Sequence, residues 1–184
     1  MGPASALVWP LVLGSTHEAQ DGQCETIITP KTWRHAGVLA DDPALHQVVA
    51  HELVHHVQAN ARTGAAWTSH FPDKHGVRIS RDGLSYAVEG HADWADRQVT
   101  TRLFGTPASH RTAQKSWRYR IHDNPVIRRL GPSREAYEQG GALIERAVEL
   151  LGPPAVNQVW EDISLLPTQA EIADADAWAH RLRG

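Results

Sequence analysis

The sequence predicts an α+β fold that is mostly helical and carries a small N-terminal β-sheet. Two short apolar runs near the N-terminus, 6–13 and 24–29, have the length and composition of strands. Longer segments that begin near residues 44, 84 and 133 have apolar residues at helical spacing and end at glycine or proline. Helices therefore make up most of the expected structure.

Length and charge narrow the class of protein. At 184 residues the chain is long enough for one domain with a proper core, so we expect a single domain over 1–184. Within it, 1–43 would hold the small sheet and an entry loop, and 44–184 would form a helical core around the functional site. The net charge of −3, with no block of Lys or Arg, argues against a nucleic-acid partner and against an anionic membrane surface.

The N-terminal residues do not predict export or membrane insertion. The apolar run 4–13 is interrupted by Pro10, lacks a preceding basic region and is too short to span a bilayer. The single cysteine, Cys24, excludes an internal disulfide, and a packed small side chain is its simplest role. We therefore expect a cytoplasmic protein.

The first elements are expected to form the small sheet. Strands are predicted at 6–13 and 24–29, and the polar residues 14–23 between them predict a loop. Pro30 closes the second strand, and 32–42 is expected to be an irregular entry to the first long helix.

A long helix is expected over 44–61, which contains neither proline nor glycine. Asp41 or Asp42 can cap its N-terminus, with Pro43 in the first helical position. Its apolar residues recur at helical spacing and predict one buried stripe, formed by Leu45, Val48, Val49, Leu53, Val54 and Val57.

This helix contains the motif H-E-x-x-H, formed by His51, Glu52 and His55. Residues four apart share a helix face, so both imidazoles can bind one metal ion. Glu52 can take a proton from water at that metal. In a chain with 12 histidines a chance match is conceivable, but it would seldom fall inside an amphipathic helix. The motif therefore predicts a zinc site. His56 points about 100° away from His55 and is interpreted as a core or surface histidine.

The next helix, expected over 84–104, supplies a third ligand, because a catalytic zinc usually has three from the protein. We predict Glu89 as this ligand and Asp93, on the same face, as the carboxylate that hydrogen-bonds a ligand imidazole. The alternative is that both are solvated surface charges. His91 is the competing third ligand. A glycine inside a helix is less favourable than alanine by about 1 kcal/mol. The presence of Gly90 therefore predicts that the two helices approach each other closely at the site.

The remaining segments are expected to be helices joined by loops. A loop at 65–83, containing a short strand at 77–80, links the two long helices. Further helices are expected at 109–119, near 125, at 133–151, at 155–163 and at 168–182. A capping box formed by Thr168 and Glu171 marks the start of the last one.

The segment H-E-L-V-H followed by E-G-H-A-D resembles the gluzincins, in which a glutamate on a later helix is the third zinc ligand. The longer pattern is similar to a zincin-like family of zinc metallopeptidases, sometimes described as associated with deazaflavin coenzyme biosynthesis. The shared segments lie between about 36 and 182: the H-E-x-x-H helix, V-E-G-x-A-D at 88–93, Y-E-x-G at 137–140, and W-E…L-P-T-x-x-E-I…W from 160 to 178. The resemblance implies a zincin-like metallopeptidase core with Zn2+ as its cofactor.

These residues predict a zinc-dependent hydrolase of the metallopeptidase type. Zinc would lower the pKa of its water to about 7, and Glu52 would take the proton as the water attacks an amide carbonyl. Tyr119 and His122 are favoured as donors to the resulting oxyanion. Three further residues are candidates for the same role: His110, Tyr86 and Tyr137. The strand at 25–29 could pair with an extended peptide substrate, as the edge strand of zincins does.

Two other interpretations use the same residues. A small-molecule metalloenzyme, such as a cyclase or lyase, would use zinc as a Lewis acid and Glu52 as the base, and the short stretch before the metal helix favours it. A non-catalytic, metal-stabilised protein is the third interpretation. It is disfavoured because a structural site closes its fourth position and has no need of a base.

Overall fold

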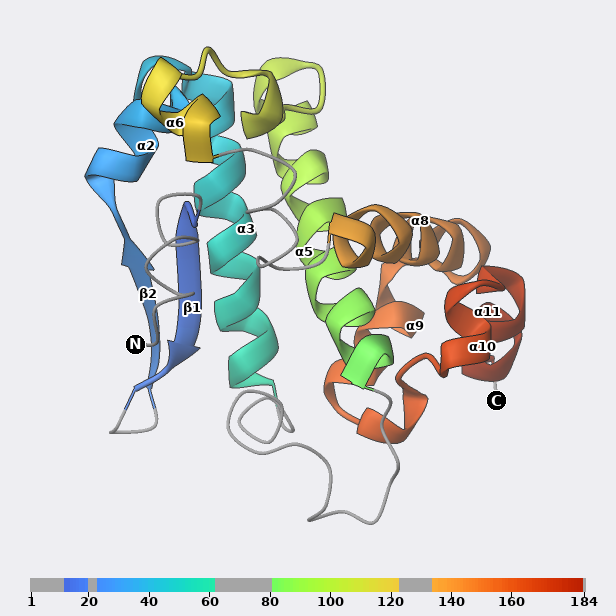
Figure 1. The fold of residues 1–184 in the computed structure, drawn as a ribbon. Coiled ribbons are helices and arrows are strands. Elements are labelled where there is room, and N and C mark those ends of the chain that lie inside the picture. Colours follow the sequence, from blue (N-terminus) through green and yellow to red (C-terminus); the bar gives the residue numbers. More distant parts are fainter. Residues whose placement is uncertain (1–11, 20–22, 62–80, 123–133, 184) are drawn as a thin grey trace. The chain divides into compact units, whose positions relative to one another are not determined.

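A computed structural model of the chain describes residues 12–19, 23–61, 81–122 and 134–183. It is mostly helical with a two-stranded antiparallel sheet near the N-terminus, which confirms the predicted fold class (Figure 1). The chain divides into two compact units, each described below by itself. The first comprises Met1–Thr16, Thr26–Glu52 and Ala95–Ser133, and the second His17–Glu25, Leu53–Trp94 and Arg134–Gly184. The single domain expected from the sequence stays a prediction.

The sheet pairs β1, Gly14–Glu18, with β2, Cys24–Ile28. β2 confirms the second predicted strand. The prediction of a loop at 14–23 is wrong, because β1 lies inside it. The sequence Gly-Ser-Thr-His-Glu has no apolar alternation, so the strand depends on pairing with β2, supported by a 2.7 Å hydrogen bond between the hydroxyls of Thr16 and Thr26. The other predicted strand, 6–13, lies mostly outside the described residues.

A helix follows where an irregular entry was predicted. Helix α2, Pro30–Ala36, begins at the proline, because the fixed φ of proline suits the first turn of a helix. It ends at Gly37, whose φ of 84° is a left-handed conformation that favours glycine. A 3₁₀ turn, Val38–Ala40, then leads into the first long helix.

The two long helices confirm the sequence prediction. They are α3, Asp42–Asn60, and α5, Arg81–Phe104, and each runs uninterrupted and contributes to both units (Figure 1). Asp41 caps α3 by accepting a 3.0 Å hydrogen bond from the backbone N–H of Ala44. Gly105, with φ of 79°, ends α5.

The first unit has a small core of its own. After α5 come a 3₁₀ turn, His110–Thr112, and helix α6, Trp117–His122, so the predicted helix at 109–119 is largely wrong. The core side chains are Leu13, Trp33, Ala36, Val38, Val48 and Tyr119. The predicted strand at 77–80 and the short helix near 125 lie outside the described residues.

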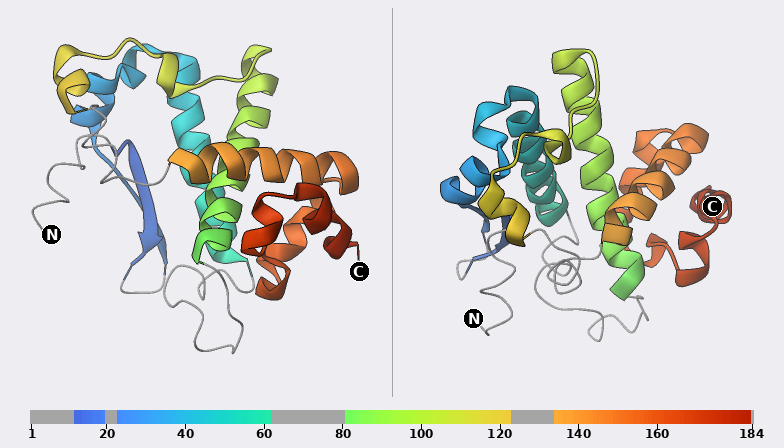
Figure 2. Two further views of the ribbon diagram at one scale, coloured as in Figure 1. Left: turned by 45° about the vertical axis from the view of Figure 1, so that its right-hand side comes forward. Right: turned by 45° about the horizontal axis from the view of Figure 1, so that its top comes forward.

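The second unit ends in a group of helices. These are α8, Arg134–Leu151; α9, Pro153–Asn157; α10, Gln169–Ile172; and α11, Ala175–Leu182, with 3₁₀ turns at Gln158–Trp160 and Ile163–Leu165. Helix α8 packs against α9 and α11 (Figure 2). The predicted capping box of Thr168 and Glu171 is confirmed. The predicted helix at 168–182 is two helices, because Asp174 caps a new one by accepting from Ala177 N–H.

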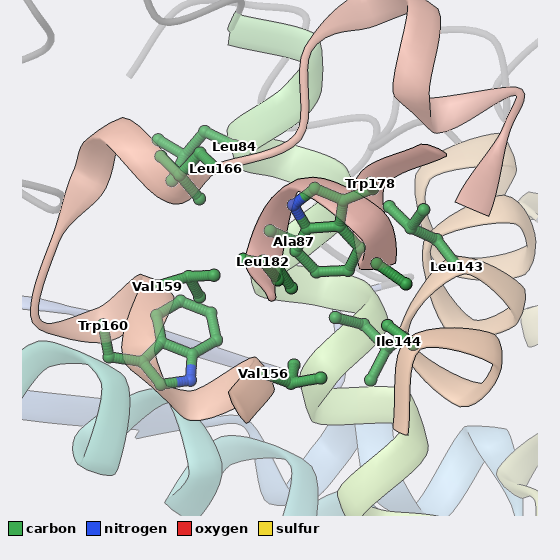
Figure 3. Close-up of a cluster of buried hydrophobic side chains, with 12 residues drawn as sticks. Leu84, Ala87, Leu143, Ile144, Val156, Val159, Trp160, Leu166, Trp178 and Leu182 are labelled. Carbon is green, nitrogen blue, oxygen red and sulfur yellow. The ribbon is translucent and has the colours of Figure 1, made fainter. Parts of the chain in front are cut away.

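The core of the second unit surrounds Trp178, which is fully buried (Figure 3). Leu84 and Ala87 contribute to it from α5, and Leu143 and Ile144 from α8. Helix α5 is therefore held by the C-terminal helices close to its predicted ligand, Glu89. Among the described residues, none of the helices combines the length and the apolar character needed to cross a membrane.

Candidate metal centre

Helix α3 carries a polar stripe on its buried side, beside the buried apolar residues Ala44, Val48 and Ala50. At 100° per residue, four side chains fall within an arc of about 80°: Gln47, His51, His55 and Gln58. Both glutamines are buried, with 5% and 3% exposed. The predicted apolar stripe is correct for Val48 but wrong for Val49, Leu53 and Val57, which lie on the opposite side and are 41%, 57% and 66% exposed.

In the first unit, His51 is held by Asp96 of α5. His51 Nδ1 lies 3.1 Å from Asp96 Oδ2, and the carboxylate is buried. The same oxygen accepts a 2.6 Å hydrogen bond from Gln47 Nε2. An ionised carboxylate only accepts, so Nδ1 of His51 is the donor, and in the neutral ring Nε2 then carries the lone pair that a metal requires.

In the second unit, His55 has an equivalent partner on its own helix. His55 Nδ1 lies 2.8 Å from Gln58 Oε1. The other ring nitrogen, Nε2, lies 3.8 Å from Glu89 Oε2 of α5. His51 stands one turn before His55 on the same uninterrupted helix, and so on the same face.

The structure brings the three predicted ligands together. One donor atom from each of His51, His55 and Glu89 lies within 4.8 Å of the others. Ligands about 2.1 Å from a tetrahedral zinc are separated by about 3.4 Å, close to the 3.8 Å between His55 and Glu89. Two imidazole nitrogens and one carboxylate are also the ligand set of many catalytic zinc sites. The donors therefore fit a zinc ion.

Glu52, the predicted base, is buried beside strand β1. Thr16 Oγ1 donates a 2.6 Å hydrogen bond to Glu52 Oε2. A side chain on Gly14, two residues earlier on the same face of β1, would collide with Glu52 Oε1. Strand β1 thus confines the Glu52 carboxylate from one side. The hydroxyl of Thr16 lies at Oε2, and the backbone of Gly14, which has no side chain, lies at Oε1.

Asp93, predicted as the partner of a ligand imidazole, lies beside Gly141 of α8. A Cβ on that glycine would lie 3.1 Å from Asp93 Oδ2. The carboxylate that contacts His51 is Asp96, and sequence reasoning missed it. A signal was available, because Asp96 follows Glu89 by seven residues and so shares its face of α5. The role proposed for Asp93 itself stays a prediction.

Gly90 marks a close approach of helices, but not of the two predicted. A side chain at Gly90 would collide with the backbone of Gly140 in α8. A side chain at Gly140 would in turn collide with the carbonyl of Tyr86 and lie 3.1 Å from Cα of Gly90. The pair lets α5 and α8 cross with their backbones in contact, one residue after Glu89.

His91, the competing third ligand, belongs to a different environment. It is buried, and its ring lies 4.9 Å from that of Trp160 and 6.0 Å from that of Trp94. Its Nδ1 lies 3.1 Å from Gln58 Nε2. Burial lowers the pKa of His91 to about 4, so the ring is neutral at pH 7. The donor cluster found among the described residues does not include it.

The predicted oxyanion donors occupy several different places. Tyr119 is 8% exposed and packs in the core of the first unit, with Lys115 Nζ 5.4 Å from the centre of its ring. His122 is the last residue of α6, and its side chain is outside the described part. His110 Nδ1 lies 2.7 Å from Gln47 Oε1, and burial lowers the pKa of His110 to about 4. Tyr86 and Tyr137 are half-buried. The oxyanion role stays a prediction for all five.

Besides Asp96, three further residues around the site were not predicted from the sequence. Gln47 lies four residues before His51 and Gln58 three residues after His55, so helical spacing could have found both. Thr16 had no such signal, because its contact with Glu52 joins residues 36 positions apart in the chain.

Comparison with known families gives a match over part of the chain. A family model described as a zincin-like metallopeptidase matches residues 83–179, which is more than half of the chain. The match includes Glu89 and most of the C-terminal helices, and it begins after the H-E-x-x-H motif. The motif is therefore evidence additional to the match. A search of the solved structures gave no significant match.

Proposed function

The chain belongs to the zincin-like metallopeptidase family, and from this membership we propose that it is a zinc-dependent hydrolase that cleaves amide bonds. The observation that carries the proposal is the grouping of His51, His55 and Glu89, with their donor atoms within 4.8 Å of one another. A buried glutamate, Glu52, directly follows the first of these ligands.

The proposed ligands present donor atoms and a negative charge that suit a cation. His51 and His55 each use Nδ1 in a hydrogen bond, so each presents Nε2, and Glu89 adds one negative charge. A zinc ion held there would act as a Lewis acid that acidifies water and polarises a carbonyl oxygen.

Glu52 is proposed as the general base. Thr16 holds Oε2 of its carboxylate, so we assign Oε1 to accept the proton of the attacking water. The water oxygen then bonds to the amide carbon. As the C–N bond breaks, Glu52 returns the proton to the leaving nitrogen, so the base is regenerated. Tyr119 and His122 are the proposed donors to the oxyanion.

The metal site is tested first by elemental analysis of purified protein. We expect one zinc per chain in the wild type and a large loss in Glu89→Ala and His51→Ala. His56→Ala is the matched control, because it removes a neighbouring imidazole outside the donor cluster. A wild-type protein without zinc, or full zinc in Glu89→Ala, would contradict the proposed site.

The reaction is tested by digestion of a peptide library with the wild type and Glu52→Gln. We expect cleavage by the wild type, and no cleavage by a variant that still contains zinc. Full activity in Glu52→Gln would contradict the role of the base. Turnover of small amides or other small molecules, with no peptide cleaved, would instead favour the small-molecule enzyme.

A further inference from the structure

We propose that Gln58 is a positioning residue that holds His55 in its Nδ1–H tautomer and so presents Nε2 of His55 to the metal. The proposal rests on the metal site proposed above. It adds a residue outside the H-E-x-x-H motif, three positions beyond its second histidine.

The contacts of Gln58 fix which way its side-chain amide points. Gln58 Nε2 lies 3.0 Å from the backbone carbonyl oxygen of Val88, which only accepts hydrogen bonds. The NH₂ group must therefore face Val88, and the amide oxygen faces His55. At 2.8 Å from that oxygen, Nδ1 of His55 has to carry the proton.

His91 strengthens this assignment from the other side. The second N–H of the Gln58 amide points to His91 Nδ1 at 3.1 Å, so this nitrogen accepts. His91 also hydrogen-bonds the side chain of Asn157. The amide is thus held at three points, by Val88, His91 and His55, all within the second unit.

The burial of Gln58 makes its hydrogen bond important for the tautomer of His55. Gln58 is 3% exposed, so water cannot readily replace the partners that it satisfies. Without the amide oxygen, His55 Nδ1 loses this acceptor, and a neutral imidazole can more readily place its proton on Nε2. A ring protonated on Nε2 cannot bind the metal through that atom. The hydrogen bond therefore removes a competing state of the ligand.

His51 provides an internal comparison. Its Nδ1 is held by Asp96 of the first unit, not by Gln58. A change at Gln58 should therefore alter the tautomer of His55 and leave that of His51 as it is. A merely structural role for Gln58 would not separate the two histidines.

The direct test is the ¹⁵N chemical shifts of the two imidazoles in the metal-free protein, assigned with His51→Gln and His55→Gln. We expect Nδ1–H for both in the wild type. Gln58→Met, which keeps the length of the side chain but removes the amide, should give an Nε2–H population at His55 alone. Wild-type His55 protonated on Nε2, or an unchanged His55 in Gln58→Met, would overturn the proposal.

Zinc affinity, measured by competition with a chelator, is the second readout. We expect Gln58→Met to bind zinc about 10- to 100-fold more weakly, and Asn60→Met, an exposed control on the same helix, to bind as the wild type does. Gln58→Glu should keep wild-type affinity, because a carboxylate accepts from Nδ1, yet lose stability because it cannot donate to Val88 or His91. Equal affinity in Gln58→Met and Asn60→Met would overturn the proposal.

The test also covers a Gln58→Met variant that does not fold and a wild type that binds no zinc. If Gln58→Met does not fold, Gln58→Glu carries the test: an Nδ1–H tautomer at His55 supports the proposal, and its loss overturns it. If the wild type binds no zinc, the proposed function fails, whereas the tautomers of the metal-free protein still decide the role of Gln58.

Discussion

The hydroxyl of Thr16 donates a 2.6 Å hydrogen bond to Oε2 of Glu52 and so connects strand β1 with the H-E-x-x-H motif on α3. Thr16 Oγ1 also lies 2.7 Å from the hydroxyl oxygen of Thr26, and because the proton of Thr16 goes to Glu52, Thr26 is the donor in this pair. The small sheet therefore contacts the predicted base directly.

Thr16→Val should lower turnover while leaving the zinc content unchanged. Valine keeps the shape of threonine but cannot donate to Glu52, and a hydrogen bond to a charged group is worth about 1.5–3 kcal/mol. We expect a loss of roughly tenfold or more in kcat, measured on a peptide found by the library digest. Ser15→Ala is the control, because Ser15 lies on the other face of β1. Equal activity in the two variants would show that Thr16 does not position the base.

Asp96→Asn should weaken zinc binding by about 10- to 100-fold, because His51 loses a charged acceptor for Nδ1. Asp93→Asn should have a smaller effect. The two dissociation constants are compared by chelator competition at one pH. A greater loss in Asp93→Asn would restore the role that the sequence predicted for Asp93.

Gly140→Ala should destabilise the protein by about 1–3 kcal/mol, because its Cβ would collide with the carbonyl of Tyr86. Gly141→Ala is the matched control. Its Cβ would meet only the end of the Asp93 side chain, at 3.1 Å, and alanine favours the helix by up to about 1 kcal/mol. Urea denaturation measures both. A loss in Gly141→Ala as large as in Gly140→Ala would argue against a tight backbone crossing.

The ion pair of Glu171 and Arg181 should give a stability that depends on pH. Hydrogen bonds from Arg181, at 2.7 and 2.9 Å, are the main cause that lowers the pKa of Glu171 from 4.5 to about 2. The folded state therefore favours the ionised carboxylate. The stabilisation is present above pH 4.5 and is lost as the pH falls towards 2.

Glu171→Gln should accordingly reduce the free energy of unfolding by about 1 kcal/mol at pH 7, and the difference should shrink between pH 4.5 and 2. Glutamine can still serve in the capping box, so the change isolates the charge. Glu149→Gln, in an exposed pair with Arg146, is the control and should change little. A difference that is constant with pH would rule out the charge as the cause.

The sequence predicted the long helices, and it predicted a group of donor residues that the structure brings together, because both depend on local spacing. The i,i+4 pair of His51 and His55 fixes a common face wherever the helix lies. Pro43 marks the start of a helix because its fixed φ suits the first turn, and Gly105 marks the end of one because its φ of 79° favours glycine. Such signals need no knowledge of the tertiary structure.

Two of the errors have a physical cause in common, namely contacts between distant residues. Strand β1 is polar and is specified by its partner strand, and Gly90 packs against Gly140, fifty positions later. On α3, Val49, Leu53 and Val57 were predicted to be buried but are exposed, whereas the polar Gln47 and Gln58 are buried. Hydrophobic spacing predicts burial only where the buried face is apolar, and on α3 that face also holds the polar side chains around the predicted ligands.

The polar stripe has a consequence for which changes α3 can accept. One alanine inserted between Glu52 and Leu53 would rotate His55 and Gln58 by about 100° relative to Gln47 and His51. Composition would hardly change, yet the four side chains would no longer share a face. By contrast, Val49 and Val57 on the exposed side could become lysine or glutamate with the spacing intact. The angular positions of these side chains around α3 thus matter more than the hydrophobicity of the helix. Insertions and deletions of single residues should be the changes that α3 tolerates least.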